Sequence, residues 1–91
     1  MATSDKTWTI EAEIMPKRGV NDPQGEAVLS GLKQLGFANV NRVRVGKVIR
    51  VNLTAESEDA ARAAGQEMCE KLLANPVIEE FELTVRAAEE E

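Results

Sequence analysis

Side chains that could carry out chemistry are scarce in this sequence. Its 91 residues include no histidine and a single cysteine, Cys69. Without histidine there is no imidazole to act as a general base, as a metal ligand or as the centre of a catalytic triad, and Cys69 has no such base to activate it as a nucleophile. The 16 carboxylates are spread along the chain without forming a recognisable acid–base pair. The sequence therefore predicts no catalytic, cofactor-binding or metal-binding residues.

The stretch Asp22-Pro23-Gln24-Gly25 predicts the start of a helix and raises the question of a binding site. Aspartate is a good N-cap, and proline fits the first helical position. A capping box would have Glu or Gln where Gly25 stands. Either the glycine lets the helix pack closely on the sheet, or it leaves a bare helix N-terminus for an anion or an effector. Asp22 would repel an anion, which favours close packing.

The preceding Lys17-Arg18 could meet a phosphate or a carboxylate of a partner, although a solvated loop is the simpler interpretation. An acylphosphatase would place a catalytic arginine in such a loop. The glycine-rich phosphate loop that this chemistry requires is missing from residues 15–23, so we reject this activity.

Hydrophobic periodicity predicts four strands and two helices around these residues. The strands are expected at about 6–15, 40–45, 48–53 and 77–85, with a turn at Gly46-Lys47, and the helices at 23–35 and from Ser57 to Asn75-Pro76. The expected inward stripes are Val28, Leu29, Leu32 and Leu35 on the first helix, and Ala61, Ala64, Gly65, Met68 and Leu72 on the second.

This order of elements, β-α-β-β-α-β, predicts an α+β fold of the ferredoxin-like kind, with a four-stranded antiparallel sheet and two helices on one face. A chain of 91 residues is expected to form one domain, 1–91, with frayed tails at 1–5 and 87–91. Gly25 would then face the sheet.

The other face of this sheet would be polar, with acidic residues on one half and basic residues on the other. Two interpretations remain open: cross-strand ion pairs within the chain, or a docking surface on which a two-fold partner lays acid against base. The residues are Glu11, Glu13, Glu80 and Glu82 on the acidic half, and Arg42, Arg44 and Arg50 on the basic half.

The overall charge argues against several classes of partner. A net charge of −5 and only three aromatic residues argue against binding to nucleic acid. The longest apolar runs are a few residues, so no membrane span is expected. The absence of a signal-like N-terminus and the lone cysteine indicate a cytoplasmic protein.

Three stretches together resemble the PurS family, the small subunit of phosphoribosylformylglycinamidine synthase. They are RGVNDPQGE at 18–26, VRVGKVI at 43–49 and CEKLLANPVIEEFE at 69–82, and the resemblance covers about residues 7–86. It implies an enzyme of purine biosynthesis with three separate chains: a glutaminase, a large ATP-binding synthetase and this small subunit. That enzyme converts formylglycinamide ribonucleotide, glutamine and ATP to formylglycinamidine ribonucleotide, glutamate, ADP and phosphate.

For this chain the resemblance implies a non-catalytic role. The subunit would form a homodimer, with a dimer of dimers left open, would bridge the glutaminase and the synthetase, and would support transfer of ammonia. ATP and Mg²⁺ would belong to the synthetase. The motif residues become candidates for subunit interfaces: Arg18, Asp22, Pro23, Gly25, Arg44, Gly46, Lys47, Asn75, Pro76 and Glu79.

A second interpretation is an effector-binding module of the ACT type. Such modules share the β-α-β-β-α-β order and contact an amino acid through a turn before the first helix. Asp22-Pro23-Gln24-Gly25 is near that pattern without matching it.

Overall fold

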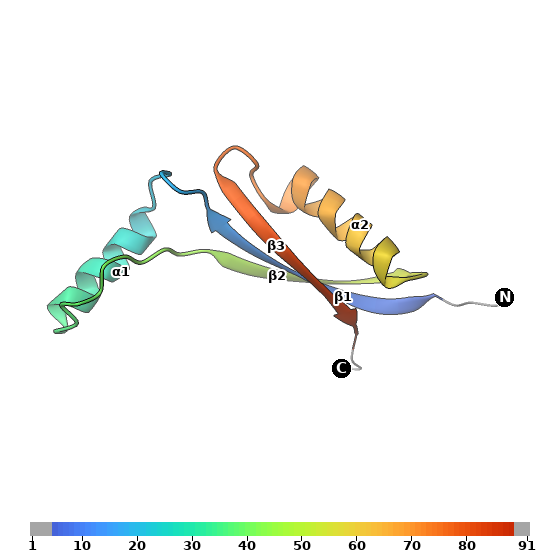
Figure 1. Cartoon of the computed structure of the whole chain (residues 1–91), viewed down its shortest axis with the longest axis horizontal. Coiled ribbons are helices and arrows are strands. Elements are labelled where there is room, and N and C mark those ends of the chain that lie inside the picture. The colour runs from blue at the N-terminus through green and yellow to red at the C-terminus, as the bar shows by residue number, and fades with distance from the viewer. Residues whose placement is uncertain (1–4, 89–91) are drawn as a thin grey trace.

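The computed structural model describes residues 5–88, and these form two α-helices, one π-helical turn and a three-stranded antiparallel sheet (Figure 1). The strand order is β2-β1-β3, so β1 lies in the centre. The α+β class is as predicted. The elements are β1 (Lys6–Pro16), α1 (Pro23–Gln34), β2 (Lys47–Ala55), α2 (Glu58–Met68), the π-helical turn η1 (Cys69–Leu73) and β3 (Glu79–Ala87).

The alternation of apolar residues in the three strands produces one continuous apolar face. Ile10 lies opposite both Val51 and Val85, and other apolar residues of the strands pair in the same way. The side chains of Ile10, Ala12 and Ile14 are almost completely buried. α2 packs on this face, as Figure 1 shows, so the core lies between α2 and the centre of the sheet.

Small residues let α2 approach the sheet closely. The helix begins at Ser57, whose hydroxyl accepts a hydrogen bond from the Ala60 amide at 3.0 Å, as expected of an N-cap. Ala61, Gly65 and Cys69, spaced four apart, are buried against the sheet. A Cβ on Gly65 would lie only 2.8 Å from Cδ1 of Ile10, so a larger residue here would have to displace the Ile10 side chain.

One part of the predicted stripe on this helix is wrong. Leu72 was expected to face the sheet, but 82% of its surface is exposed. The cause is η1, where the Ala74 amide bonds back to the Cys69 carbonyl five residues earlier at 3.0 Å. The wider turn shifts the inward positions, so that Cys69 and Ala74 are buried and Leu72 is not.

The predicted strand at 40–45 does not form, and the predicted four-stranded sheet is therefore wrong within residues 5–88. The chain is irregular from 37 to 46, so Gly46-Lys47 is the entry to β2 and not a hairpin turn. α1 begins and ends where the sequence predicts, with Gly36 in the left-handed region at φ +100°.

The position of α1 also differs from the prediction that both helices cover one face of the sheet. α1 lies beyond the end of the sheet and away from α2 (Figure 1). Its predicted inward residues Val28 and Leu35 are 45% and 75% exposed. The chain is consequently elongated, with extents of 61 × 29 × 15 Å.

The chain divides into two regions, a body and an arm, joined at a neck. The body comprises residues 5–16 and 47–88, which form the sheet with α2 and η1. The arm comprises residues 17–46 and contains α1. The neck is the junction where the chain leaves β1 for the arm and returns to β2. The tails predicted at 1–5 and 87–91 fall mostly outside the described residues, although Ala87 belongs to β3.

Candidate functional site

The structure brings the predicted interface residues together at the neck. Residues 18–25 lead from β1 into α1, residues 44–47 lead into β2, and residues 75–79 lead from η1 into β3. These three segments are far apart in the sequence and meet at one end of the sheet (Figure 1). The motifs identified from the sequence therefore form one spatial cluster.

Asp22 ties the start of α1 to the returning chain. Its Oδ1 accepts a hydrogen bond from the Gly25 amide at 3.0 Å, which is the predicted N-cap. Its Oδ2 accepts a second from the Val45 amide, also at 3.0 Å. Pro23 occupies the first helical position, where no backbone donor is needed. The two oxygens of Asp22 thus accept hydrogen bonds from two segments of the neck, the start of α1 and the chain that returns to β2.

These contacts change the acidity of Asp22. The backbone N–H of Val45 and then that of Gly25 donate to the charged carboxylate and hold the pKa of Asp22 below its usual value. Arg44 and Arg42 lower this pKa further by their positive charge. Asp22 therefore holds the neck in its ionised form.

Gly25 is buried, as predicted, but the element that it faces is not the sheet. A Cβ on Gly25 would lie 2.5 Å from the carbonyl oxygen of Val43 and against the carboxylate of Asp22. Gly46 is similarly confined, because a Cβ there would meet the Ile14 carbonyl oxygen and the Met15 sulfur. The two glycines let the returning chain pass close to α1 and to the end of β1.

The loop of residues 75–79 closes the other side of the neck. Glu79 Oε1 accepts the Asn75 amide at 2.7 Å, and Glu79 Oε2 lies 3.9 Å from the Nζ of Lys47. Lys17 donates from Nζ to the Pro76 carbonyl at 2.6 Å and from its amide to the Ile78 carbonyl at 2.8 Å. This loop is therefore fixed to both strands that border the arm.

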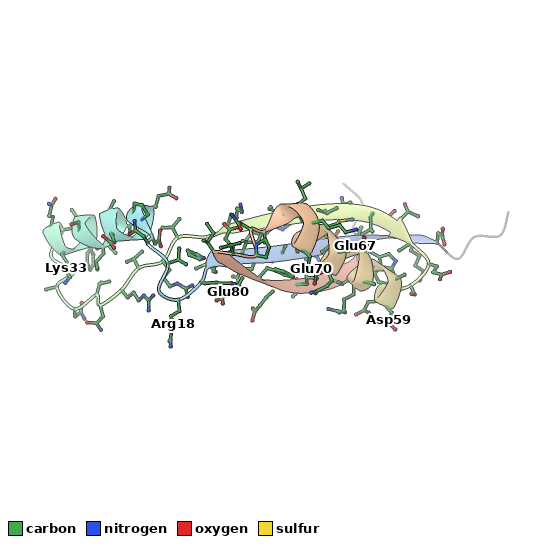
Figure 2. The ribbon with its side chains drawn as sticks, turned by 90° about the horizontal axis from the view of Figure 1, so that it is seen from above. Arg18, Lys33, Asp59, Glu67, Glu70 and Glu80 are labelled. Carbon is green, nitrogen blue, oxygen red and sulfur yellow. The ribbon has the colours of Figure 1, made fainter. Side chains whose placement is uncertain are left out.

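The two arginines of the set behave differently. Arg44 reaches the body, with Nη2 at 3.8 Å from Glu80 Oε2. Arg18 is exposed in the turn after β1 and makes no hydrogen bond or ion pair within residues 5–88; it is labelled in Figure 2. Sequence reasoning did not identify two backbone contacts of the segment 22–25. The Asp22 carboxylate accepts a hydrogen bond from the Val45 amide, and Gly25 lies against the Val43 carbonyl oxygen. An N-cap motif predicts only the local donor, the Gly25 amide, and not a donor that comes from 23 residues away.

The polar face of the sheet contains the cross-strand ion pairs that one interpretation predicts. Arg50 Nε donates to Glu11 Oε1 at 2.8 Å, and Arg86 Nη1 lies 3.6 Å from the same oxygen. The predicted basic half is incomplete, because Arg42 and Arg44 lie on the arm and not in the sheet.

Side chains at the neck bond mainly to backbone groups of other segments. Within residues 5–88 no three His, Cys, Asp or Glu side chains are grouped so that they could hold a metal ion. Burial raises the pKa of the Cys69 thiol, and the charge of Glu70 adds to this effect, so the thiolate is disfavoured. In the same part of the chain, neither helix has the length and apolarity that a membrane crossing requires.

Comparison with known proteins gives a consistent result. The family model described as "PurS: Phosphoribosylformylglycinamidine (FGAM) synthase" matches residues 9–87. The phosphoribosylformylglycinamidine synthase subunit PurS of Archaeoglobus fulgidus is 49% identical over 70 residues, which are 77% of this chain and 88% of that protein.

Solved structures agree with this match. The PurS of Methanocaldococcus jannaschii, one of the subunits of formylglycinamide ribonucleotide amidotransferase in the purine biosynthetic pathway, is similar with a TM-score of 0.78 and 38% identity, covering 90% of this chain and 99% of that one. A chain in the structure of PurLQS from Thermotoga maritima is similar with a TM-score of 0.80 and 30% identity, covering 88% and 98%. These matches give no support to the ACT-like alternative.

Proposed function

The chain belongs to the PurS family of phosphoribosylformylglycinamidine synthase, and we propose that it is the small subunit that joins the glutaminase and the large synthetase subunit of that enzyme in purine biosynthesis. In this proposal the larger subunits perform the reaction and bind ATP and Mg²⁺. The small subunit has no active site of its own and supports transfer of ammonia by holding the other two in place. The free, buried Cys69 fits a reducing compartment, and we place the complex in the cytoplasm.

The observation that carries this proposal is the incomplete burial of the arm. The radius of gyration is 17.5 Å, whereas a compact domain of this length would have about 12 Å. Val28, Leu35 and Phe37 of the arm are 45%, 75% and 52% exposed. Apolar side chains gathered on an element that packs on no sheet face are typical of a surface that another chain covers.

We infer that a second copy of this chain covers the arm, as expected for a homodimer. The charges favour such pairing. The arm carries five basic and two acidic residues, whereas the described part of the body carries six basic and eleven acidic residues. Figure 2 shows Arg18 and Lys33 on the arm, Asp59 and Glu67 on α2, and Glu70 on η1. In a two-fold dimer the basic arm of each copy can approach the acidic body of the other.

The same pairing would complete the ferredoxin-like arrangement. In the body, the outer edge of β2 is unpaired within residues 5–88, and Ile49, Val51 and Leu53 are only half-buried on the apolar face. These are the places where the predicted strand 40–45 and the first helix would lie. We propose that the partner copy supplies both elements. Whether two dimers associate further stays a prediction of the family resemblance.

Reconstitution with the other two subunits tests the assembly role. The purified chain is mixed with the glutaminase and the large synthetase, and the glutamine-dependent synthetase rate and the mass of the complex are measured. We expect a three-component complex and a rate that depends on this chain. Full activity of the two larger subunits without it would contradict the proposal.

Light scattering of the isolated chain tests the dimer separately. We expect a mass near twice 9.9 kDa, and a monomer for the variants Val28→Glu and Leu35→Glu, which place a charge on the exposed apolar side of α1. Ala63→Glu, at an exposed position of α2, is the matched control and should leave the mass unchanged. A wild-type monomer, or a dimer that survives both arm variants, would refute pairing through the arm.

A further inference from the structure

β3 forms one edge of the sheet, and a row of its backbone groups points away from the other strands. The strand order is β2-β1-β3, so β3 pairs with β1 on one side only (Figure 1). The Ala88 amide donates to the Thr7 carbonyl at 2.9 Å. Because hydrogen bonds alternate along an antiparallel ladder, the even-numbered residues of β3 bond to β1. The outward N–H and C=O groups, which have no partner within residues 5–88, include those of Phe81, Leu83 and Val85.

We propose that this edge pairs with the same edge of a second copy, antiparallel and about a two-fold axis at Leu83. An exposed strand edge is a template for a further strand. With the axis at Leu83, the new ladder uses only outward backbone groups, since Leu83 lies opposite its own copy and Phe81 lies opposite Val85. The hydrogen bonds between β3 and β1 stay intact, so the two sheets join edge to edge.

The charges on β3 favour a second copy over an unrelated strand. In this register Glu80 of each copy lies opposite Arg86 of the other, so the ion pair forms twice. Both residues belong to non-hydrogen-bonded pairs, in which facing side chains are closest. Their side chains are accessible, at 59% and 52% exposed. An axis one residue earlier would instead place Glu82 against Glu82, which is unfavourable.

The apolar face of the sheet supports the same register. Phe81, Leu83 and Val85 are only half-buried on the face that carries α2. A two-fold axis perpendicular to the sheet keeps the apolar faces of both copies on one side. Phe81 then meets Val85 of the second copy, and aromatic and β-branched residues form favourable cross-strand pairs. One register therefore matches opposite charges on one face and apolar side chains on the other.

This surface is separate from those that form the dimer proposed above. That dimer uses the arm and the edge of β2, which lies on the other side of β1 from β3. Edge pairing would therefore join one dimer to another, and it does not depend on the arm contact. A single pair of strands buries little surface, and interfaces below about 1,200 Å² are typical of weak association. We therefore expect edge pairing at higher protein concentration than the arm-paired dimer.

Amide hydrogen exchange of the ¹⁵N-labelled chain, at about 0.05 and 1 mM protein, tests the proposal because exchange reports protection of single amides. The outward amides of Phe81, Leu83 and Val85 should exchange at least about twofold more slowly at the higher concentration. The amides of Glu82 and Thr84, which bond to β1, are internal controls and should exchange slowly at both. Leu35→Glu, which targets the arm, should leave this concentration dependence unchanged, so that failure of the arm dimer and failure of edge pairing give different results.

Charge reversal tests the register. Arg86→Glu places like charges opposite each other and should abolish the dependence on concentration, whereas the double variant Glu80→Arg/Arg86→Glu restores opposite charges and should recover it. Arg50→Glu is the matched control, because it also removes an ion pair with Glu11 but lies on β2. Its outward β3 amides should behave as in the wild type.

Three results would overturn the proposal. The first is exchange of the outward amides that does not depend on protein concentration. The second is a dependence that persists in Arg86→Glu, and the third is a folded double variant that does not recover it.

Discussion

Gly25→Ala is the most direct test of how the neck is built. In an isolated helix this change would be favourable by about 1 kcal/mol, because alanine has the higher helix propensity. Here the added Cβ would lie 2.5 Å from the Val43 carbonyl oxygen, well inside van der Waals contact. The obstacle is backbone, which moves only if the returning chain separates from α1. Overpacking of this kind costs about 1–3 kcal/mol, which exceeds the gain in helix propensity.

The net expectation is that the arm loses up to about 2 kcal/mol of local stability. α1 has 12 residues and packs on no sheet face, and a helix of that length is marginal without tertiary contacts. Amide hydrogen exchange of α1 should therefore become faster, by up to about 30 times. Thermal unfolding of the body, followed by the fluorescence of Trp8 in β1, should hardly change, because Trp8 lies far from the neck.

The chain provides a matched control for this experiment. Gly31 lies in the same helix, and a Cβ there would meet no atom within 4 Å. Gly31→Ala should therefore show the helix propensity alone and slow exchange of α1 by about fivefold, which corresponds to about 1 kcal/mol. If Gly25→Ala slows exchange as Gly31→Ala does, the contact with Val43 does not constrain the arm and the reasoning fails.

Three further predictions concern the neck, the sheet and α2. The pKa of Asp22 is lowered, so its contribution to the stability of the arm is complete above the unfolded pKa of about 4 and is lost as the pH falls through the folded pKa. Asp22→Asn should therefore remove the acid-dependent loss of helical circular dichroism, and an unchanged acid profile would contradict this prediction. Glu11→Gln removes the ion pairs with Arg50 and Arg86 and should slightly lower the urea midpoint for unfolding of the body. The difference in midpoint from the wild type should vanish in concentrated salt, and a difference that persists there would exclude the ion pairs as its cause. Cys69→Ser should lower the free energy of unfolding by about 1–3 kcal/mol because it buries a hydroxyl, whereas Leu72→Ser, at an exposed position, should change it by less than about 0.5 kcal/mol. Equal losses for the two variants would refute the orientation that η1 imposes on these side chains.

The helices and the strands of the body could be predicted from the sequence because their signals are local. The Asp22-Pro23 cap, Gly36 at the helix end and the alternation in β1 each fix a conformation within a few residues. The segment 40–45 shows where this reasoning stops. This segment passes the neck without pairing in the sheet, and its backbone at Val43 and Val45 meets α1 and Asp22. Alternation indicates an extended chain between two environments, and it does not say that one of them is a sheet.

The amphipathic stripe of α1 has the same ambiguity at the level of tertiary structure. It predicts that Val28 and Leu35 must be covered, and the sequence offers the sheet of the same chain as the nearest cover. In the structure the neck holds α1 away from that sheet, through the ionised Asp22 and two glycines whose backbones touch neighbouring segments. A disordered linker would leave the arm free to fold back onto the sheet of the same chain. The specific hydrogen bonds of the neck prevent this movement. The structure therefore fixes the arm in an open position, and an arm fixed in that position is suited to a partner chain.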